Sequence, residues 1–452
     1  MHILKGYTKQ EISWMMYDWA NSAHSVIIVT LLPIFFDTVA GYTADSVSSM
    51  STWGYATSIA MLIVALAAPF LGVFGDIRGM RKKLFSFFML LGVAACAGMA
   101  FTPGMDFTSG PVAAGKVASL ILVLYIVSVI GFDASAIYYD AFLTDVTIED
   151  RMDKVSTMGY GLGYIGGSTI PLLIFLIMNL VGVPMLTCLA FVFGLTAVWW
   201  LTFSLPLLKN CEQTSGKPYE KGDVARSIKG VGTTIKEIIA NKPMLIYILS
   251  YFFYIDGVHT VISMATTYGT NLGLDSTGMM LALLLVQILG LPFCLLYIKC
   301  SEKFGARTMV GFGICVYMFI CIFAFFMNSL WQFWVLAVLC ATSQGGIQAL
   351  SRSMYGKLIP DKDRSGEFFG FFDIFGKFSS IMGPALVGVV SSAVANGMLG
   401  AQGLTAQTAT AEQIDAINAQ SSHYGILSII IIIIVGAVLY FGFLPKAEHA
   451  KQ

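Results

Sequence analysis

Runs of about 20 apolar residues recur along the whole chain, and each is long enough to cross roughly 30 Å of hydrocarbon as an α-helix. Of the 452 residues, 57% are hydrophobic and only 12% are charged, whereas soluble domains carry about 25% charged residues. The runs therefore predict an all-α integral membrane protein. The twelve expected spans lie near residues 13–37, 52–75, 84–102, 117–142, 156–180, 182–206, 244–270, 277–299, 308–327, 331–351, 367–392 and 422–444.

Basic residues are distributed unevenly, although the formal net charge is zero. All 26 Lys and Arg residues except Lys116 and Lys377 fall near the two ends or in the connections that follow even-numbered spans. By the positive-inside rule these connections and both termini are cytoplasmic. Two termini on the same side require an even number of spans, which agrees with twelve. We expect a monomeric, multi-pass protein of the cell (inner) membrane, with the lipid bilayer around it and no nucleic-acid partner.

The longest polar stretch, residues 207–243, divides the spans six and six. It predicts a cytoplasmic linker between an N-terminal six-helix bundle (1–206) and a C-terminal six-helix bundle (244–452). Within it, Ala225 to Ile239 has the pattern of an amphipathic helix on the membrane surface, and an ordinary solvated connector fits equally well. The outer connection 393–421 is rich in Ala, Gln and Thr, so we expect a short surface helix or a loop without chemistry.

Two loops, one in each half, share a pattern of an acid, a glycine and a base. Glycine allows a tight turn, and an acid with several bases can form a charge network that links helices in one conformation. Breaking such a network changes the balance between inward-open and outward-open forms, so we predict a gate; alternatively, the bases only satisfy the positive-inside rule. The gate residues are Gly72, Asp76, Gly79, Arg81 and Lys82 after the second span, and Glu302, Gly305 and Arg307 after the eighth.

The two halves also keep a trace of duplication. Parallel halves are the arrangement of the major facilitator fold, which places a substrate site near the membrane midplane between two pseudo-symmetric six-helix bundles. The signature GxxxDxxGxRK after the second span closely resembles the loop motif of that superfamily. At a constant offset of 213 residues, Asp150, Arg151, Gly163 and Pro171 recur as Asp363, Arg364, Gly376 and Pro384.

Ionisable side chains inside the spans are candidates for transport, because each is expensive at the bilayer centre. The first span of each half repeats one polar spacing, so each offers an acid to an interior cavity. We assign ion coupling to an acid in each of spans 1, 4 and 7; for Asp140, a sodium ligand and half of a structural ion pair are alternatives to a proton carrier. The candidates are Asp18, Asn21, Ser22 and Ser25 in span 1, Asp133 and Asp140 in span 4, and Asp256, His259, Thr260 and Ser263 in span 7.

Span 10 carries a stripe formed by Gln344, Gln348 and Arg352. Glutamine amides can hold a bound solute, and they can equally bridge helices. In span 11, Asp373 and Lys377 stand four residues apart, and the lysine is expected to pair with this acid or with one on another span. The pair can be a gate, a counter-ion for a substrate carboxylate or a structural element. The substrate contacts that we predict are Asn21, His259, Gln344 and Gln348.

No pattern for catalysis is present in the sequence. The eight cysteines include no CxxC pair, and HExxH, GxSxG and nucleotide-binding patterns are missing. We therefore expect no enzyme, no metal site and no cofactor. The expected coupling ion is H⁺, with Na⁺ as the alternative.

Several longer blocks are dispersed over both halves: YDWANSA (17–23), YYDAFLTDV (138–146), GYGLGYIGG (159–167), YFFYIDGVHT (251–260), GGIQALSRSMYGKLIP (345–360) and GEFFGFFDIFGKF (366–378). Together they resemble the vacuole-effluxer family of major facilitators, as a bacterial-type member. The resemblance implies a secondary transporter that works by alternating access and, by analogy with the fungal members, exports small neutral amino acids.

The leading functional prediction is proton-coupled efflux of a small polar or amphipathic, amino-acid-like solute through a central cavity lined by spans 1, 4, 7 and 10. A sodium-coupled symporter of a small solute is the nearest alternative, since carboxylates and hydroxyls also suit a hard cation. A lipid or lysolipid translocator is another. From a different class, a sensor on a transporter scaffold would bind its ligand without moving it.

Overall fold

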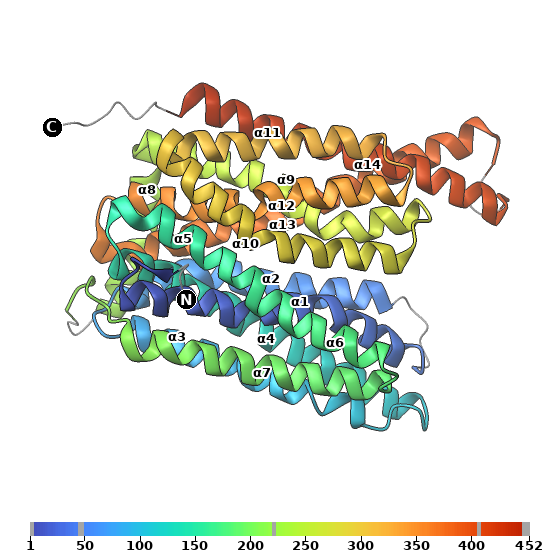
Figure 1. The fold of residues 1–452 in the computed structure, drawn as a ribbon, viewed down its shortest axis with the longest axis horizontal. Helices are drawn as coiled ribbons and strands as arrows, with labels where there is room; N and C mark the ends of the chain where they lie inside the picture. The colour runs from blue at the N-terminus through green and yellow to red at the C-terminus, as the bar shows by residue number, and fades with distance from the viewer. Residues whose placement is uncertain (1–3, 44–48, 219–222, 405–407, 445–452) are drawn as a thin grey trace. The chain divides into compact units, whose positions relative to one another are not determined.

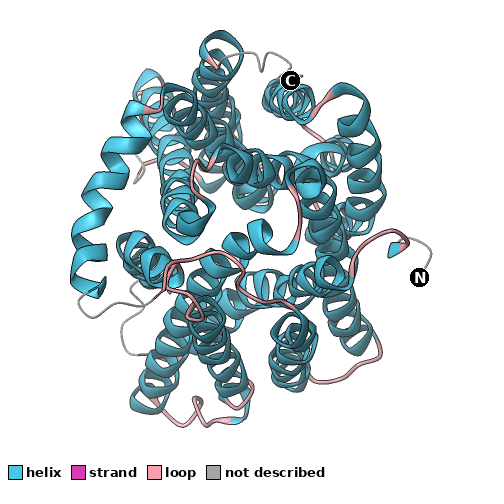
Figure 2. Ribbon diagram, turned by 90° about the vertical axis from the view of Figure 1, so that its left-hand side faces the viewer, coloured by secondary structure: helices cyan, strands magenta, loops and turns pink. Residues whose placement is uncertain are grey.

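The computed structural model describes residues 4–43, 49–218, 223–404 and 408–444. Within these ranges the chain consists of helices and loops (Figure 2), with one isolated parallel bridge between Ile77 and Lys217. Twelve helical segments of the described chain are long and apolar enough to cross a membrane. This number and the all-α class agree with the sequence prediction.

The chain divides into two compact units, and Figure 1 labels their helices. Unit 1 contains Met1–Thr234 and Ile359–Ile374, and unit 2 contains Ile235–Leu358 and Phe375–Gln452. One long helix, α13 (Ser365–Ala401), begins in unit 1 and continues in unit 2. The domain bounds expected from the sequence, 1–206 and 244–452, follow the order of the spans and remain a prediction.

Unit 1 is built around its first helix, α1, which packs against α4, α5 and α7. A capping box starts α1: the Thr8 hydroxyl accepts the Glu11 N–H at 3.1 Å, and the Glu11 carboxylate accepts the Thr8 N–H at 2.7 Å. Trp14 and Tyr17 on this helix are completely buried. The helices of this unit are α1 (Lys9–Ala40), α2 (Ser49–Gly75), α3 (Arg81–Met99), η2 (Thr102–Gly104), α4 (Pro111–Val146), α5 (Glu149–Gly163), η3 (Tyr164–Thr169), α6 (Ile170–Leu180), α7 (Met185–Asn210), the start of α8 (Asp223–Ala240) and η4 (Lys362–Arg364).

Unit 2 repeats this packing with equivalent helices. Its first span, α9, packs mainly against its last, α14, as α1 does against α7, and α12 packs against α10 and α11, as α4 does against α2 and α3. The helices of this unit are α9 (Lys242–Asn271), α10 (Ser276–Phe304), α11 (Ala306–Phe325), α12 (Leu330–Leu358), the remainder of α13, α14 (Ala411–Val438) and η5 (Leu439–Phe443).

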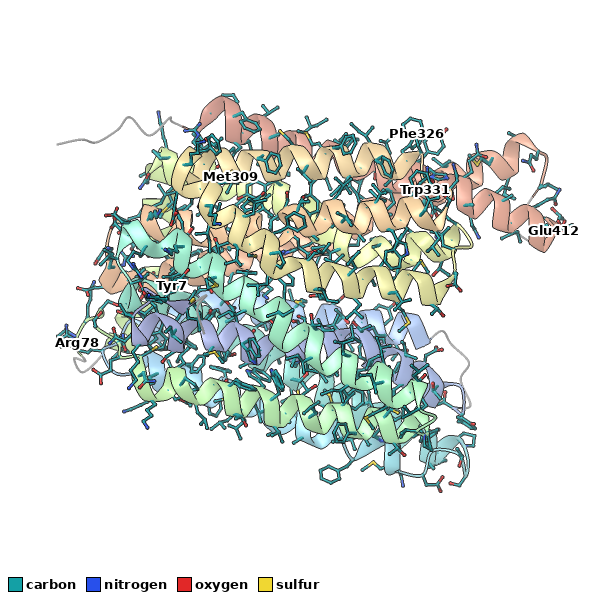
Figure 3. All side chains as sticks on the ribbon, in the orientation of Figure 1. Tyr7, Arg78, Met309, Phe326, Trp331 and Glu412 are labelled. Atoms are coloured by element: carbon teal, nitrogen blue, oxygen red, sulfur yellow. The ribbon has the colours of Figure 1, made fainter. Side chains whose placement is uncertain are left out.

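Large apolar side chains remain exposed on both units (Figure 3). Leu180 is 86% exposed, and Phe326 and Trp331 are each 65% exposed. Such a surface is unfavourable in water and suits a helix surrounded by lipid, where all backbone polar groups are satisfied inside the helix. Phe326 and Trp331 flank the connection between α11 and α12, a position typical of aromatic residues at a membrane interface.

Two local features differ from the sequence prediction. The expected loop or surface helix at 393–421 is mostly taken up by extensions of α13 to Ala401 and of α14 from Ala411. Alanine favours helix, and Thr410 caps α14 by accepting the Gln413 N–H. The fifth span contains a π-helix, η3, which directly precedes Pro171 near the start of α6. Proline lacks the N–H for a regular turn, and a wider turn accommodates it.

The linker contains the helix predicted over Ala225 to Ile239, which the structure places at Asp223–Ala240 as α8. Its buried positions Val231, Thr234 and Ile238 share one face. The expected location of this helix on the membrane surface remains a prediction.

Candidate functional site

Arg81, the base of the predicted gate, is the centre of a buried polar network in unit 1. Its side chain is 0% exposed. One terminal nitrogen, Nη2, donates to Asp76 Oδ1 at 3.0 Å and to the Ser365 hydroxyl at 2.9 Å. The other, Nη1, donates to Asp145 Oδ2 at 2.5 Å, to the Ser215 hydroxyl at 3.1 Å and to the Ala141 carbonyl at 3.2 Å. The guanidinium is therefore held between two carboxylates, which makes its burial tolerable.

Asp76 connects this network to the start of α13. Its Oδ1 accepts the Gly366 N–H at 2.7 Å, and its Oδ2 accepts the Glu367 N–H at 2.8 Å. The first N–H groups of a helix have no partner inside the helix and attract negative charge. Burial raises the pKa of the Asp76 carboxyl to about 7, although the Arg81 charge and the two N–H donors act in the opposite direction.

Gly72 and Gly79 of the predicted gate must be glycines for two different structural reasons. A Cβ atom at Gly72 would overlap the carbonyl oxygen of Gly366, so α2 and the start of α13 can touch only because Gly72 has no side chain. Gly79 has a φ of +81°, in the left-handed region that favours glycine, and forms the turn into α3. Lys82 is half-buried and does not bond to Asp76 or Asp145 in the described part of the chain.

The corresponding loop of unit 2 has different contacts. Glu302 is exposed near the end of α10. Gly305, with a φ of +83°, forms the turn into α11. Arg307 donates to the backbone carbonyl of Leu444 at 2.7 Å, and the Tyr440 hydroxyl donates to the Arg307 carbonyl at 2.9 Å. These bonds fasten the end of the last helix, and a gating role for this loop remains a prediction.

A second polar cluster in unit 1 surrounds Asp18 on α1. The Tyr139 hydroxyl of α4 donates to Asp18 Oδ2 at 2.7 Å, and the Trp14 indole donates to the Tyr139 carbonyl at 2.8 Å. The hydroxyls of Tyr17 and Ser135 lie 2.7 Å apart. Asp18 is 8% exposed, so a coupling acid predicted from the sequence is buried between α1 and α4.

The fifth span meets the polar face of α1 through glycines. A Cβ atom at Gly163 would lie 2.6 Å from the Ser22 hydroxyl, and one at Gly167 would lie 2.5 Å from the Trp19 carbonyl. A Cβ at Gly159 would overlap the Asp18 carboxylate. Close packing therefore explains the glycine spacing of this span, as small residues commonly do in membranes. Asn21, on the same helix as Ser22, is 8% exposed.

Two further acids lie on α4, where Asp133 is 2% exposed and Asp140 is half-buried. Sequence reasoning did not select a nearby residue, His24 of α1, which is 1% exposed. Its Nε2 lies 3.2 Å from the Ser128 hydroxyl, and its ring stacks on Phe132 at 4.7 Å between centroids. A histidine in mid-span, three residues after Asn21, is the signal that could have identified it.

Asp256 on α9 is a deeply buried acid of unit 2. Its side chain is 0% exposed. Oδ1 accepts the Gly383 N–H of α13 at 2.9 Å and the Thr260 hydroxyl at 3.4 Å. Oδ2 is buried and has no hydrogen-bond partner among the described residues. A Cβ at Gly383 would overlap the Thr260 hydroxyl, so α13 approaches the acid through a glycine that precedes Pro384.

Other predicted site residues of unit 2 lie on α9, α12 and α13. His259 is half-buried on α9, and the charge of Lys377 on α13 acts on it electrostatically. Asp373 precedes Lys377 by one turn and is also half-buried. Arg352 on α12 is 3% exposed, and the adjacent Ser351 binds two tyrosine hydroxyls through its carbonyl and its own hydroxyl.

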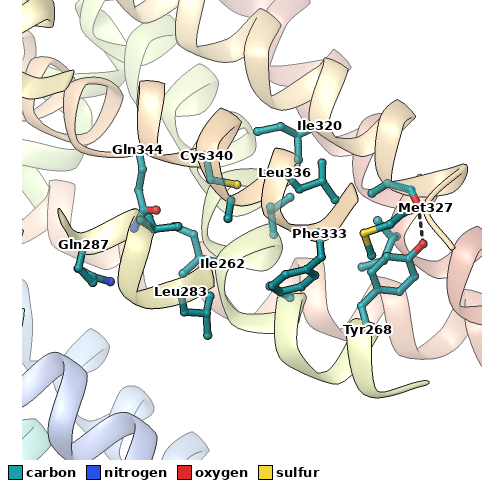
Figure 4. Close-up of a pocket in the computed structure, with 16 residues that line it drawn as sticks. Ile262, Tyr268, Leu283, Gln287, Ile320, Met327, Phe333, Leu336, Cys340 and Gln344 are labelled. Carbon is teal, nitrogen blue, oxygen red and sulfur yellow. Dashed lines mark hydrogen bonds between the residues drawn. The ribbon is translucent and has the colours of Figure 1, made fainter. Parts of the chain in front are cut away.

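A pocket of about 90 Å³ lies among α9, α10, α11, α12 and α14 inside unit 2 (Figure 4). Gln287 and Gln344 lie at one end and Tyr268 at the other, with apolar side chains such as Leu336 between them. The Tyr268 hydroxyl donates to the Ala324 carbonyl at 2.5 Å. Gln287 Oε1 has no hydrogen-bond partner in the described part of the chain. Gln348 is half-buried and does not line this pocket.

Solved structures with the same arrangement of helices are major facilitators. The proton:xylose symporter XylE matches with a TM-score of 0.70 at 14% sequence identity, covering 97% of this chain and 96% of that one. A bacterial homologue of the iron transporter ferroportin matches with a TM-score of 0.62 at 15% identity, covering 95% and 98%. Together with the twelve candidate spans, this likeness shows the major facilitator fold.

Sequence comparison shows that the protein is a major facilitator transporter and not an enzyme, and it identifies the family. Residues 41–149 and 144–400 match the family described as "Vacuole effluxer Atg22 like", and the chain belongs to it. It is 40% identical over 452 residues to an "Uncharacterized MFS-type transporter YxiO" of Bacillus subtilis (strain 168), covering 98% of this chain and 96% of that protein. "Autophagy-related protein 22-1" of Aspergillus niger is 26% identical over 263 residues, which is 53% of this chain and 42% of the fungal protein.

Proposed function

We propose that this transporter works by alternating access and couples the outward movement of a small polar or amphipathic, amino-acid-like solute to protons. We place it in the cell membrane with both termini cytoplasmic. The observation that carries the proposal is the environment of Asp256, which is fully buried with one oxygen bonded and the other without a partner among the described residues.

An ionised carboxylate in such a site is expensive, because it is shielded from bulk solvent and forms no ion pair among the described residues. A proton on Oδ2 removes the charge and leaves Oδ1 free to accept the Gly383 and Thr260 hydrogen bonds. Asp256 is thus suited to bind a proton when buried and to release it when water reaches the site. Asp18, with its Tyr139 hydrogen bond, and the half-buried Asp140 are the further coupling acids.

The gate network supports alternating access. Asp76 and Arg81 bind the first turn of α13, a helix whose remainder belongs to the other unit. These bonds can hold one conformation, and their release would free the start of the helix for the other.

An amino-acid-like solute is supported by the groups in unit 2. Lys377 can pair with a carboxylate, and Gln344 offers amide donors and acceptors at one end of the pocket. The apolar walls of the same pocket also favour an amphipathic solute, and a lysolipid is the second candidate on this ground.

The test is transport by the purified protein in proteoliposomes with a mixed pool of neutral amino acids, sugars, organic acids and lysolipids. We expect uptake driven by an imposed pH gradient, without a requirement for sodium. Asp256→Asn should abolish gradient-driven uptake and keep counterflow, which needs no net proton movement. Asp150→Asn, at an exposed position in α5, is the matched control. Full gradient-driven uptake by Asp256→Asn would overturn the proposal. Dependence of uptake on a sodium gradient would identify Na⁺, and not H⁺, as the coupling ion.

A further inference from the structure

The chain that leaves α7 folds back onto the gate. We call residues Gln213–Lys217 the strap. Gln213 Oε1 accepts the N–H groups of Gly79 at 2.8 Å and Arg81 at 3.2 Å, and its Nε2 donates to the Gly75 carbonyl at 2.9 Å. One side chain of the strap therefore shapes the turn that presents Arg81.

The strap also forms a short parallel bridge with the loop between α2 and α3. The Arg78 N–H donates to the Lys217 carbonyl and the Lys217 N–H donates to the Asp76 carbonyl, both at 2.9 Å. Gly216 has a φ of +112°, and a Cβ there would lie 2.6 Å from the Asp76 carbonyl oxygen. The sequence needs glycine at this position, because any side chain would push the strap away from the gate.

Two hydroxyl residues of the strap hold the second carboxylate of the gate. Asp145 Oδ1 accepts the Thr214 hydroxyl at 2.8 Å, the Ser215 N–H at 2.9 Å and the Ser215 hydroxyl at 2.7 Å. Its other oxygen bonds to Arg81. The strap thus positions both partners of this buried ion pair.

The linker reaches the start of α13 at two further places. The Gly216 N–H donates to Asp363 Oδ1 at 2.8 Å. Thr234 on α8, which is 0% exposed, donates to Glu367 Oε1 at 2.5 Å and accepts a hydrogen bond from Arg364. The segment that begins α13 is therefore held by Asp76 and also by both parts of the linker.

We infer that the linker is a working part of the gate and not only a tether between the two halves. Gln213 and Ser215 are positioning residues for Arg81 and Asp145. The bonds from Gly216 and Thr234 hold α13 in the closed gate and break when it opens, whereas the strap stays on the loop between α2 and α3. The inference rests on the alternating access proposed above.

Single-amide hydrogen exchange of the full-length protein in lipid nanodiscs tests it without a known substrate. The N–H groups of Gly366 and Glu367 lie in the first turn of α13, so their protection depends on Asp76 and reports the closed gate. We expect Thr234→Val and Asp363→Ala each to speed exchange at these two amides by about tenfold, the effect of losing one hydrogen bond. Thr233→Val, at the exposed neighbouring position, is the matched control and should change nothing.

Asp76→Ala, which removes both oxygens that accept the Gly366 and Glu367 N–H groups, serves as the reference that opens the gate directly. If Asp76→Ala speeds the exchange but Thr234→Val and Asp363→Ala behave like Thr233→Val, the linker is a passive tether and the inference is overturned. If even Asp76→Ala leaves the two amides protected, the gate itself is absent and the inference falls with it. Asp363 is exposed, so its variant is not expected to impair folding.

Discussion

The loops that follow α2 and α10 share the order acid, glycine, base, but their bases lie in different surroundings. Arg81 is completely buried between Asp76 and Asp145. Arg307, its counterpart, is half-buried and bonds to a backbone carbonyl. The residue 213 positions after Asp145 is Leu358, so the second half lacks the carboxylate that completes the first. The residues packed around the motif, and not the residues of the motif alone, decide whether it can act as a gate.

The largest expected effect separates the two arginines. Arg81→Ala leaves two buried carboxylates without their base, and breaking a buried ion pair costs about 3–5 kcal/mol. Arg307→Ala removes a half-buried base together with its hydrogen bond to the Leu444 carbonyl. Contacts of a partly exposed arginine are screened by solvent, so the loss should be smaller, about 1–2 kcal/mol. Thermal unfolding of the purified variants should therefore show a much larger drop in Tm for Arg81→Ala. Equal drops would mean that the two loops are energetically alike.

The pH dependence of the gate is the next effect in size. The pKa of Asp76 is about 7 in this conformation against an ordinary value of 3.8. The charged and titratable groups around it are Arg81 on α3, Glu367 on α13 and Tyr138 on α4. Because this pKa is higher in the closed gate, Asp76 takes up a proton when the gate closes at a pH between 3.8 and about 7. The preference for the closed form should therefore fall as pH rises towards 7, by at most about tenfold per pH unit, and level off above it.

Hydrogen exchange at Gly366 and Glu367 between pH 4.5 and 8, corrected for intrinsic rates, measures this preference. In Asp76→Asn the dependence should disappear, since the titrating group is gone. A preference for the closed form that grows with pH would contradict the assignment.

The twelve spans were predictable because lipid demands continuous apolar helices, and hydropathy records this directly. The ends of α13 and α14 were not, since alanine and glutamine outside the apolar window continue a helix without raising hydropathy. Asp76 and Arg81 were found from their local motif. Asp145 and Gln213 lie 64 and 132 residues from Arg81, and only packing reveals that they are its partners.

The predicted transport residues show the same limit. The spacing in the first span of each half predicted an acid that faces an interior cavity; Asp18 and Asp256 are both buried, and the cavity remains a prediction. The Gly383 N–H that binds Asp256 left no trace in the sequence, because every residue except proline carries such a group. His24 was visible in mid-span, but its contact with Ser128 depends on how α1 packs against α4.

The smallest expected effect concerns an ion pair at the edge of the same gate. Lys362 and Glu149 are 2.8 Å apart, but their side chains are 44% and 55% exposed. Solvent screens such a pair, so Lys362→Ala should lower the free energy of unfolding by only about 0.5 kcal/mol. It should also leave exchange at Gly366 and Glu367 nearly unchanged. If Lys362→Ala opened the gate as far as Asp76→Ala does, charge near α13 would matter more than burial, and the contrast between the Arg81 and Arg307 loops would need another cause.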